Sequence, residues 1–240
     1  MLQDRPCKIS VITVCRNVEK CIAETIESVL GQTYEDIEYV LIDGASTDNT
    51  VNIIREYAKE YKIKYVSESD KGIYNAMNKG LRLSTGDYIV FINAGDGFWD
   101  KDVVKNVVAF MNKVKGDIYY GNCVRTNKRL VKEMHTNNGT LLQMLKGKQP
   151  YHQCTFAAKS AFEKNMFDET YKVRSDFNWF LKCKKRGYRF QYIDIVVSKY
   201  AKLGYSGRSK QRKSYRSETA RSIKKNFPLL YWFYKISSVI

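Results

Sequence analysis

The chain has 240 residues, of which 44% are hydrophobic, 13% aromatic and 28% charged, as in ordinary globular proteins. This composition excludes disordered, collagen-like and small disulfide-rich classes. The formal net charge of +16 is unevenly distributed: residues 1–120 hold 15 basic and 18 acidic residues, whereas residues 121–240 hold 26 and 7. The second half therefore suits an anionic partner, either nucleic-acid phosphates or lipid headgroups.

The two ends of the chain and its cysteines indicate a cytoplasmic protein. Residues 1–6 lack a basic stretch followed by an apolar core, so no secretory signal is expected. The apolar run at 227–240 is shorter than the roughly 18 to 20 residues that span a bilayer. The six cysteines form no Cys-x-x-Cys pair and have no histidine at zinc-finger spacing, which predicts reduced thiols.

Strands and helices alternate in the first hundred residues. Short branched apolar runs predict buried parallel strands, and apolar residues at helical spacing predict helices between them. Asn17 and Gly31 are expected to cap the first helix. The predicted elements are strands at 9–14, 37–42, 63–66 and 88–92, a helix through Ile22, Ile26, Val29 and Leu30, and helices at 47–61 and 73–83. This order predicts an open, mostly parallel, Rossmann-like sheet with helices on both faces and a ligand crevice beyond the carboxyl ends of its strands.

The alternation is less regular in the second half. The expected elements are a helix at 101–114, a strand at 118–121, a polar stretch at 122–139, a helix at 174–186 and a strand at 190–197. Between Lys199 and Lys225 there are ten basic residues and one acid, Glu218, and aromatic residues crowd the last fourteen positions. This segment, 199–240, suits an anionic membrane surface, and docking on the core or on a second subunit is the alternative. The sequence leaves open whether the chain forms a homodimer.

Three polar clusters follow predicted strands and should line the crevice. They are Cys15-Arg16-Asn17, Asp43 to Asp48, and Asn93-Ala94-Gly95-Asp96. Each cluster alone is typical of turns and helix caps, so their coincidence on neighbouring strands carries the argument. The crevice lacks a Gly-x-Gly-x-x-Gly fingerprint and a phosphate loop, which disfavours dinucleotide dehydrogenases and P-loop enzymes.

Four ordered blocks resemble the family 2 glycosyltransferases of GT-A fold. The blocks are Ser10–Asn17 (SVITVCRN), Val40–Thr50 (VLIDGASTDNT), Glu68–Gly80 (ESDKGIYNAMNKG) and Ser84–Asp96 (STGDYIVFINAGD). The similarity is strong over about residues 7–100 and weaker to about 206. It implies an inverting enzyme, metal-dependent and of hexosyltransferase type, that moves a sugar from a nucleoside diphosphate donor to an acceptor hydroxyl.

The resemblance also implies a set of donor-binding residues. The first block with Asp43 would hold the base and ribose, and the segment from Lys71 to Asn78 would pack beside the nucleotide. The residues carried over are Val14, Arg16, Asn17, Asp43, Lys71, Gly72, Asn75, Asn78 and Asn93. The chain departs from the family where consecutive acids are replaced by Asp43-Gly44, so the contact to the base would rest on Asp43.

Asp96 is the expected ligand of a divalent cation. The family's Asp-x-Asp appears here as Asn93-Ala94-Gly95-Asp96, which retains one clear acid. Mn²⁺ or Mg²⁺ takes carboxylate, phosphate and water oxygens and can neutralise the charge of a departing diphosphate. Asn93 adds an oxygen without charge, so metal binding should depend on the donor.

Asp176 is the expected catalytic base, because an inverting transfer needs a carboxylate that takes the proton of the attacking hydroxyl. It lies in Val173–Trp179, which resembles the family's acidic motif before an aromatic helix. A helix-capping role is the alternative, and both roles can coexist. The competing acids of this half are Glu163, Asp168, Glu169 and Asp194.

Three further residues are expected on the acceptor side. His152 and Gln153 resemble the family's His-Gln pair, although a lone histidine is commonly structural. Ser206 closes Leu203-Gly204-Tyr205-Ser206, which resembles a loop that folds over the diphosphate in related sequences.

The sequence thus predicts a GT-A domain at 1–206, with a nucleotide-sugar half at 1–100 and an acceptor half at 101–206, followed by a helical, basic and aromatic tail at 207–240. The expected enzyme uses a UDP-sugar and extends a surface glycan or its lipid-linked precursor at the inner face of the cell membrane. The alternatives are a sugar nucleotidyltransferase, which should show a Gly-rich basic loop after the first strand, and a non-enzymatic nucleic-acid-binding protein. The acidic first half argues against the latter, so no nucleic-acid partner is expected.

Overall fold

The computed structural model describes residues 7–127, 130–134, 139–201 and 212–237. The strands are β1 (Ile9–Cys15), β2 (Ile37–Asp43), β3 (Ile63–Ser67), β4 (Tyr88–Phe91), β5 (Asp96–Phe98), β6 (Ile118–Asn127), β7 (Leu130–Met134), β8 (Thr155–Ala158) and β9 (Phe190–Ala201). The helices are α1 (Ile22–Leu30), α2 (Thr50–Glu60), α3 (Ile73–Leu83), α4 (Val103–Lys113), α5 (Leu141–Leu145), α6 (Lys159–Glu163), α7 (Ser175–Lys185), α8 (Arg212–Asn226) and α9 (Tyr231–Ser237), with short 3₁₀ turns η1 (His152–Cys154) and η4 (Pro228–Leu230).

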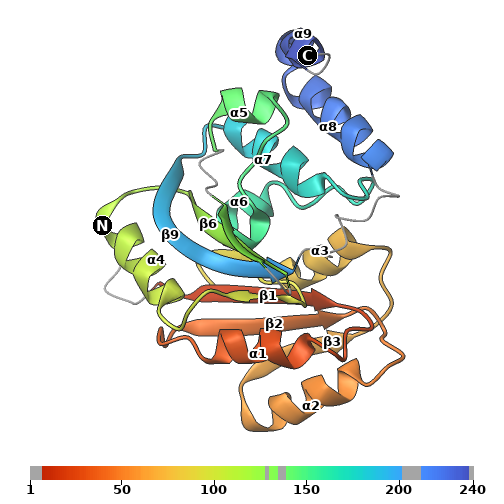
Figure 1. Ribbon diagram of the computed structural model, residues 1–240, viewed down its shortest axis with the longest axis vertical. Coiled ribbons are helices and arrows are strands. Elements are labelled where there is room, and N and C mark those ends of the chain that lie inside the picture. The colour runs from red at the N-terminus through yellow and green to blue at the C-terminus, as the bar shows by residue number, and fades with distance from the viewer. Residues whose placement is uncertain (1–6, 128–129, 135–138, 202–211, 238–240) are drawn as a thin grey trace.

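The strands form one mixed sheet in the order β3-β2-β1-β4-β8-β6-β9-β5, with β7 paired to β6. Strands β1 to β4 are parallel, as predicted, which brings their carboxyl ends to one edge. Beyond β4 the sheet is mixed: β8 is antiparallel to both β4 and β6, and β9 is parallel to β6. The register of β6 against β9 shifts twice near Asn122, and β9 curves strongly at this part of the sheet (Figure 1).

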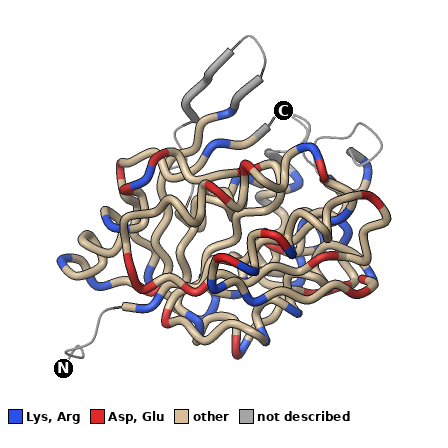
Figure 2. The backbone as a smooth tube through the Cα atoms, turned by 90° about the horizontal axis from the view of Figure 1, so that it is seen from below, with Lys and Arg blue, Asp and Glu red and all other residues tan. Residues whose placement is uncertain are grey.

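Helices cover both faces of the sheet. On one face α1, α2 and α4 pack against apolar residues such as Val11 and Leu41, and on the other α3, α6 and α7 pack against Ile12 and Ile42. Gly80 allows α3 to lie close to β1, since a Cβ there would come within 2.5 Å of the Ile12 side chain. The charged residues of both signs are interspersed along most of the chain (Figure 2).

The described parts of the polar stretch, residues 122–127 and 130–134, are more regular than their composition predicts. Strand β6 continues from Ile118 to Asn127, past the expected end at 121, and β7 returns antiparallel to it. The backbone of β6 pairs locally with β7 and non-locally with β9, and this pairing on both sides outweighs the weak strand propensity of the polar residues.

The C-terminal helices lie at one end of the molecule (Figure 1). Helix α8 packs on α7, with Thr219, Ser222 and Ile223 buried, and α9 contacts α5 and α8. Among the described residues, no helix is both long and apolar enough to cross a bilayer.

Candidate active site

The polar clusters after β1 and β2 are joined by hydrogen bonds. The backbone N–H of Asn17 donates to Ser46 Oγ at 2.8 Å, and that of Thr47 donates to Asn17 Oδ1 at 2.8 Å. Asn17 has φ of 53°, a left-handed conformation that asparagine tolerates well. The expectation that Asn17 caps α1 is wrong, because α1 begins five residues further on, at Ile22, and Cys21 occupies the cap position.

The Asp43 carboxylate is buried and anchored at the end of β2. It accepts hydrogen bonds from the Ser46 N–H at 2.9 Å, from the Ser67 hydroxyl at 2.7 Å and from the Ser46 hydroxyl. Next to it, a Cβ on Gly44 would come within 2.6 Å of an Asp70 carboxylate oxygen. The side chain of Asp70 thus lies against Gly44, so a side chain at position 44 would displace it.

The candidate residues at the start of α3 face the segment before α7. Gly72, with φ of 130°, precedes the helix, and the exposed Lys71 donates its N–H to Asn75 Oδ1 at 3.3 Å. The Asn75 amide donates to Glu169 at 2.9 Å. The buried Asn78 donates to Glu169 at 2.8 Å and exchanges two hydrogen bonds of 3.0 Å with the Phe167 backbone. These contacts tie α3 to residues 167–169.

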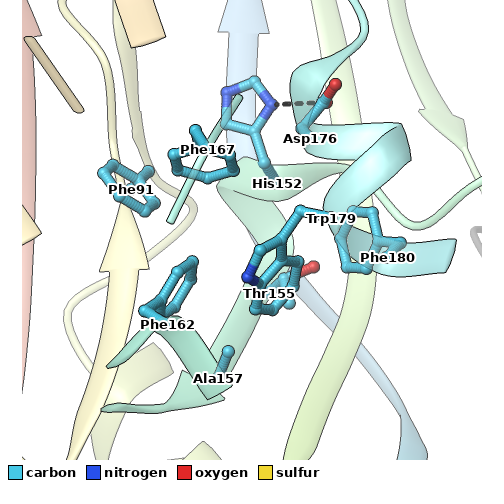
Figure 3. A pocket seen from close by; sticks show the side chains of 9 residues that line it. All are labelled: Phe91, His152, Thr155, Ala157, Phe162, Phe167, Asp176, Trp179 and Phe180. Carbon is cyan, nitrogen blue, oxygen red and sulfur yellow. Dashed lines mark ion pairs between the residues drawn. The ribbon is translucent and has the colours of Figure 1, made fainter. Parts of the chain in front are cut away.

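Asn93, His152 and Asp176 form a continuous polar chain across the site. Asn93 Nδ2 lies 3.1 Å from His152 Nε2, and His152 Nδ1 lies 3.5 Å from Asp176 Oδ2 (Figure 3). The three residues come from the end of β4, from η1 and from the first turn of α7. The structure therefore brings together the predicted donor residue Asn93, the acceptor-side residue His152 and the predicted base.

Asp176 is nearly buried and well supplied with hydrogen-bond donors. The Gln149 amide donates to Oδ2 at 2.6 Å, and Oδ1 accepts from the Phe177 N–H at 2.8 Å and from the Tyr74 hydroxyl at 3.3 Å. Burial opposes ionisation, but the donors and the nearby positive groups, His152 first, hold the pKa of Asp176 below its ordinary value. The carboxylate is therefore ionised at neutral pH.

The contact with Asp176 shifts the pKa of His152 in the opposite direction, upward. Burial alone would lower its pKa, but the hydrogen bond and charge of Asp176, with a smaller contribution from Asp96, raise the pKa of His152 above its ordinary value. His152 thus lies within electrostatic reach of both predicted acids.

Asp96 begins β5 beside this chain of residues. Its backbone N–H donates to the Asn93 carbonyl at 2.9 Å, and its carbonyl accepts from the Thr25 hydroxyl at 2.8 Å. Burial raises the pKa of Asp96 to about 7, against a smaller opposing effect of His152. The protein thus gives this carboxylate little compensating positive charge.

The remaining candidates are less closely grouped. Val14 is buried in β1 next to Ile42 of β2, Arg16 is exposed, and Gln153 is buried beside His152 with an unpaired amide oxygen. Ser206 lies outside the described residues.

A small apolar pocket lies against His152 and Asp176. Five aromatic rings line it, those of Phe91, Phe162, Phe167, Trp179 and Phe180, with Thr155 and Ala157 (Figure 3). Phe162 stacks on Trp179 at a centroid distance of 4.4 Å. Trp179 and Phe180, both in α7, form part of the pocket wall beside Asp176.

Two supporting residues were not predicted. Tyr74 and Gln149 both donate to Asp176, from α3 and from the loop after α5. Tyr74 lies inside the Lys71–Asn78 block, where the motif gave a signal, whereas nothing in the sequence around Gln149 distinguishes it from a surface residue.

Comparisons with known proteins agree with this architecture. The family model described as glycosyl transferase family 2 matches residues 10–184. A PGL/p-HBAD biosynthesis glycosyltransferase of Mycobacterium bovis is 28% identical over 202 residues, which cover 81% of this chain and 77% of the relative. The putative glycosyltransferase EpsE of Bacillus subtilis is 38% identical over 109 residues, covering 44% and 39% of the two chains.

Solved structures show the same fold. TarS residues 1–349 of S. aureus, in complex with UDP-GlcNAc, superimposes with a TM-score of 0.75 at 20% identity, covering 92% of this chain and 67% of that chain. The chain spans only 40% of a longer TarS structure. The mannosyltransferase PcManGT of Pyrobaculum calidifontis, in complex with GDP-Man and Mn²⁺, gives a TM-score of 0.71 at 20% identity, covering 92% and 64%. The chain therefore belongs to glycosyltransferase family 2 and is a glycosyltransferase of GT-A fold.

Proposed function

We propose that the protein transfers a sugar from a nucleoside diphosphate donor to an acceptor hydroxyl with inversion, and that Asp176 is the general base. The observation that carries this proposal is the nearly buried Asp176 carboxylate, which accepts hydrogen bonds from Gln149 and the Phe177 N–H and lies beside the Asn93 and His152 chain at the end of β4. The acceptor oxygen attacks the anomeric carbon, the bond to the diphosphate oxygen breaks, and the hydroxyl proton passes to Asp176. The nucleoside diphosphate leaves with the bonding electron pair.

The surroundings of Asp176 suit this role. Gln149, Tyr74 and the Phe177 N–H hold its two oxygens in place, so little reorganisation is needed when the hydroxyl arrives. His152 supports the carboxylate from the Asn93 side. The aromatic wall excludes water that would otherwise compete with the acceptor.

We further propose that Asp96 holds Mn²⁺ or Mg²⁺ together with the donor diphosphate. The described residues contain no group of three acidic, histidine or cysteine side chains that would hold a cation by themselves, so the donor must supply ligands. The residues fit such a shared site: the Asp96 carboxylate has little compensating charge, and the buried Asn93 Oδ1 has no hydrogen-bond partner. When bound, the cation would neutralise charge on the leaving group. The Mn²⁺ complex of the structurally similar mannosyltransferase supports this assignment.

The donor is proposed to be a UDP-sugar, held by the strand-end residues. The anchored Asp43, the Asn17–Thr47 link and Arg16 lie at the carboxyl ends of β1 and β2, where nucleotides bind in open α/β sheets. TarS, with a similar fold, binds UDP-GlcNAc. The acceptor is proposed to be a surface glycan or its lipid-linked precursor, and the similarity to the chondroitin synthase of Escherichia coli, 27% identical over 196 residues, favours a glycan.

We propose a peripheral attachment to anionic membrane through the C-terminal helices. Leu229 and Trp232 are 87% and 67% exposed, the highest values among the large apolar side chains of the described residues. Lys235 Nζ lies 5.4 Å from the centre of the Trp232 ring, and α8 carries six basic residues and one acid. Aromatic and basic residues in one segment are typical of surfaces that bind at the lipid headgroup level.

Donor binding tests the proposed function directly. A thermal-shift screen of UDP-, GDP-, CMP- and dTDP-sugars with Mn²⁺ should single out one UDP-sugar, since a ligand at 100 times its dissociation constant adds about 2.7 kcal/mol of stability. Transfer to acceptor glycans and lipid extracts, with NMR of the product linkage, should then show inversion. Stabilisation by no nucleotide sugar, or retention of configuration, would contradict the proposal. Family membership already favours it over a sugar nucleotidyltransferase or a nucleic-acid-binding protein.

A further inference from the structure

Helix α8 holds the segment that leads into Asp176, although it lies outside the stretch matched by the family model. Glu218, the single acid of α8, is 7% exposed and points at the backbone before α7. One of its carboxylate oxygens accepts from the Lys172 N–H at 2.9 Å. The other accepts from the N–H groups of Val173 and Arg174, both at 3.0 Å.

These three N–H groups precede the first helical residue of α7, Ser175. N–H groups at a helix start lack partners within the helix and carry the positive end of the helix dipole. The cap residue of α7, Arg174, makes no side-chain cap hydrogen bond. Of these N–H groups, that of Arg174 is at the cap position, and Glu218 adds from α8 an acceptor and a negative charge to those of Asp176 in the first turn, whose Oδ1 accepts from the Phe177 N–H.

The side chain of Arg174 also connects α7 with α8. Its guanidinium lies 4.0 Å from the ring centre of Phe177 and 4.3 Å from that of Tyr215 on α8. Its Nε donates to the hydroxyl of Thr219, also on α8, at 3.1 Å. The side chain is thus fixed between α7 and α8.

The same guanidinium reaches the loop after α5. Arg174 Nη2 donates to the Gly147 carbonyl at 2.9 Å. Two residues later, Gln149 donates to Asp176 Oδ2 at 2.6 Å. Helix α8 therefore fixes both the start of the helix that carries Asp176 and the loop that supplies its shortest hydrogen bond.

We infer that Glu218 is a positioning residue for sugar transfer: by binding the N–H groups of residues 172–174 it aims the Asp176 carboxylate at the acceptor hydroxyl. The inference rests on the proposed role of Asp176 as base. Displacements of about 1 Å at a catalytic group can cost about 10²-fold in rate, so loss of this support should appear in turnover. Donor affinity should be unchanged, because no donor-side residue contacts Glu218 in the described structure.

The test compares Glu218→Ala and Glu218→Gln with the wild-type chain at a temperature where all are folded. Glu218→Ala removes all three hydrogen bonds, whereas Glu218→Gln keeps one acceptor oxygen. Hydrogen exchange should therefore show loss of protection at the amides of 172–174 in Glu218→Ala and a smaller loss in Glu218→Gln. With the donor identified by the thermal-shift screen, kcat should fall about 100-fold and about 10-fold respectively. Binding of UDP with Mn²⁺ should match that of the wild type.

Glu38→Gln is the matched control for the loss of a buried carboxylate. Glu38 is also 7% exposed and accepts from the Thr85 N–H at 2.6 Å and the Ser10 hydroxyl at 2.5 Å, but it lies near the start of β2, away from the strand ends that form the site. This variant should lose stability and keep its kcat.

The outcomes separate the two proposals. Unchanged kcat in Glu218→Ala, with Asp176→Asn inactive, would overturn the positioning role and leave the proposed function standing. An active Asp176→Asn enzyme would instead overturn the proposed function and this inference with it. An equal fall of kcat in Glu38→Gln would show a general effect of stability and also overturn the positioning role.

Discussion

His152 Nδ1 lies 3.5 Å from Asp176 Oδ2, while the other ring nitrogen lies 3.1 Å from the amide nitrogen of Asn93. One imidazole therefore connects the proposed base on α7 with the end of β4, where the leaving group is expected. Asn93 and Asp96 belong to the same short turn, so this ring joins the proposed acceptor-side residues to the proposed donor-side residues.

Removal of the charge of Asp176 should stop transfer and spare donor binding. Asp176→Asn keeps the shape of the side chain but cannot take a proton, so kcat should fall by about 10²- to 10⁴-fold. The affinity for UDP with Mn²⁺, measured by calorimetry, should stay within about twofold. Asp168→Asn is the control, since Asp168 pairs with Lys225 at 3.2 Å and with Thr170, and it should remain active. Substantial transfer by Asp176→Asn would rule out its role as base.

The pKa of His152 should depend on Asp176. The chain has two histidines, so proton NMR can follow both ring signals, and His135→Gln assigns them. In the wild type the His152 pKa should lie above 6.5, and Asp176→Asn should lower it, because burial then acts with less opposing charge; Asp96 remains as a weaker neighbour. The His135 signal serves as the internal reference. A His152 pKa that does not respond to Asp176→Asn would show that the pair is not coupled in solution.

The shifted pKa values of His152 and Asp176 predict the pH range in which their contact stabilises the fold. The raised pKa of His152 contributes stability that is present below its unfolded value near 6.5 and is lost as pH rises through the folded value. The lowered pKa of Asp176 contributes stability that is present above about 3.8 and is lost as pH falls through the folded value. Urea unfolding should therefore show the largest difference between wild type and Asp176→Asn between about pH 4 and 6.5. A difference that grows above pH 7 would contradict this assignment.

Asp96 should control the metal-dependent part of donor binding. In Asp96→Ala, UDP with Mn²⁺ should stabilise the protein no more than UDP alone, whereas the wild type should show a clear additional thermal shift. Asp100→Ala changes a nearby exposed acid that accepts from the Asp102 N–H at 2.8 Å, and it should retain the Mn²⁺ effect. An undiminished Mn²⁺ effect in Asp96→Ala would place the cation elsewhere.

Substitution of Asn78 distinguishes a role in donor binding from a role in packing alone. Its buried amide forms hydrogen bonds with the Phe167 backbone and with Glu169. The Asn78→Ala substitution should therefore lower the free energy of unfolding by about 1–3 kcal/mol. Denaturant unfolding measures that loss. If Asn78 acts only in packing, UDP affinity should not change at a temperature where the variant is folded. A loss of UDP affinity comparable to that of Asp96→Ala would show a direct role in the donor site.

Sequence reasoning predicted the elements that depend on local pattern. The helix at 73–83 agrees with α3 at both ends, and the expected strands at 9–14 and 37–42 lie within one residue of β1 and β2, because their apolar runs are buried by helices on both faces. The β6–β7 hairpin was missed because its composition is polar and β6 also pairs with the distant strand β9. The contacts within the site could not be predicted from the sequence either. Asn93, His152 and Asp176 come from three distant segments, and they meet because β8 and α7 pack beside β4.

The exposed apolar residues of the C-terminal helices lead to a prediction for membrane binding. Burial of Leu229 and Trp232 in the headgroup region should contribute at least about 1.5 kcal/mol each, so a Leu229→Ser, Trp232→Ala double variant should bind phosphatidylglycerol vesicles more than tenfold less tightly in sedimentation assays. Binding by the wild type should weaken with added salt and be lower on phosphatidylcholine, because the lysines of this segment contribute through charge. Tyr61→Ala is the control, since Tyr61 is 46% exposed at the end of α2, far from α9 (Figure 1), and it should bind as the wild type does. Equal vesicle binding by the double variant and the wild type would exclude this surface as the site of attachment.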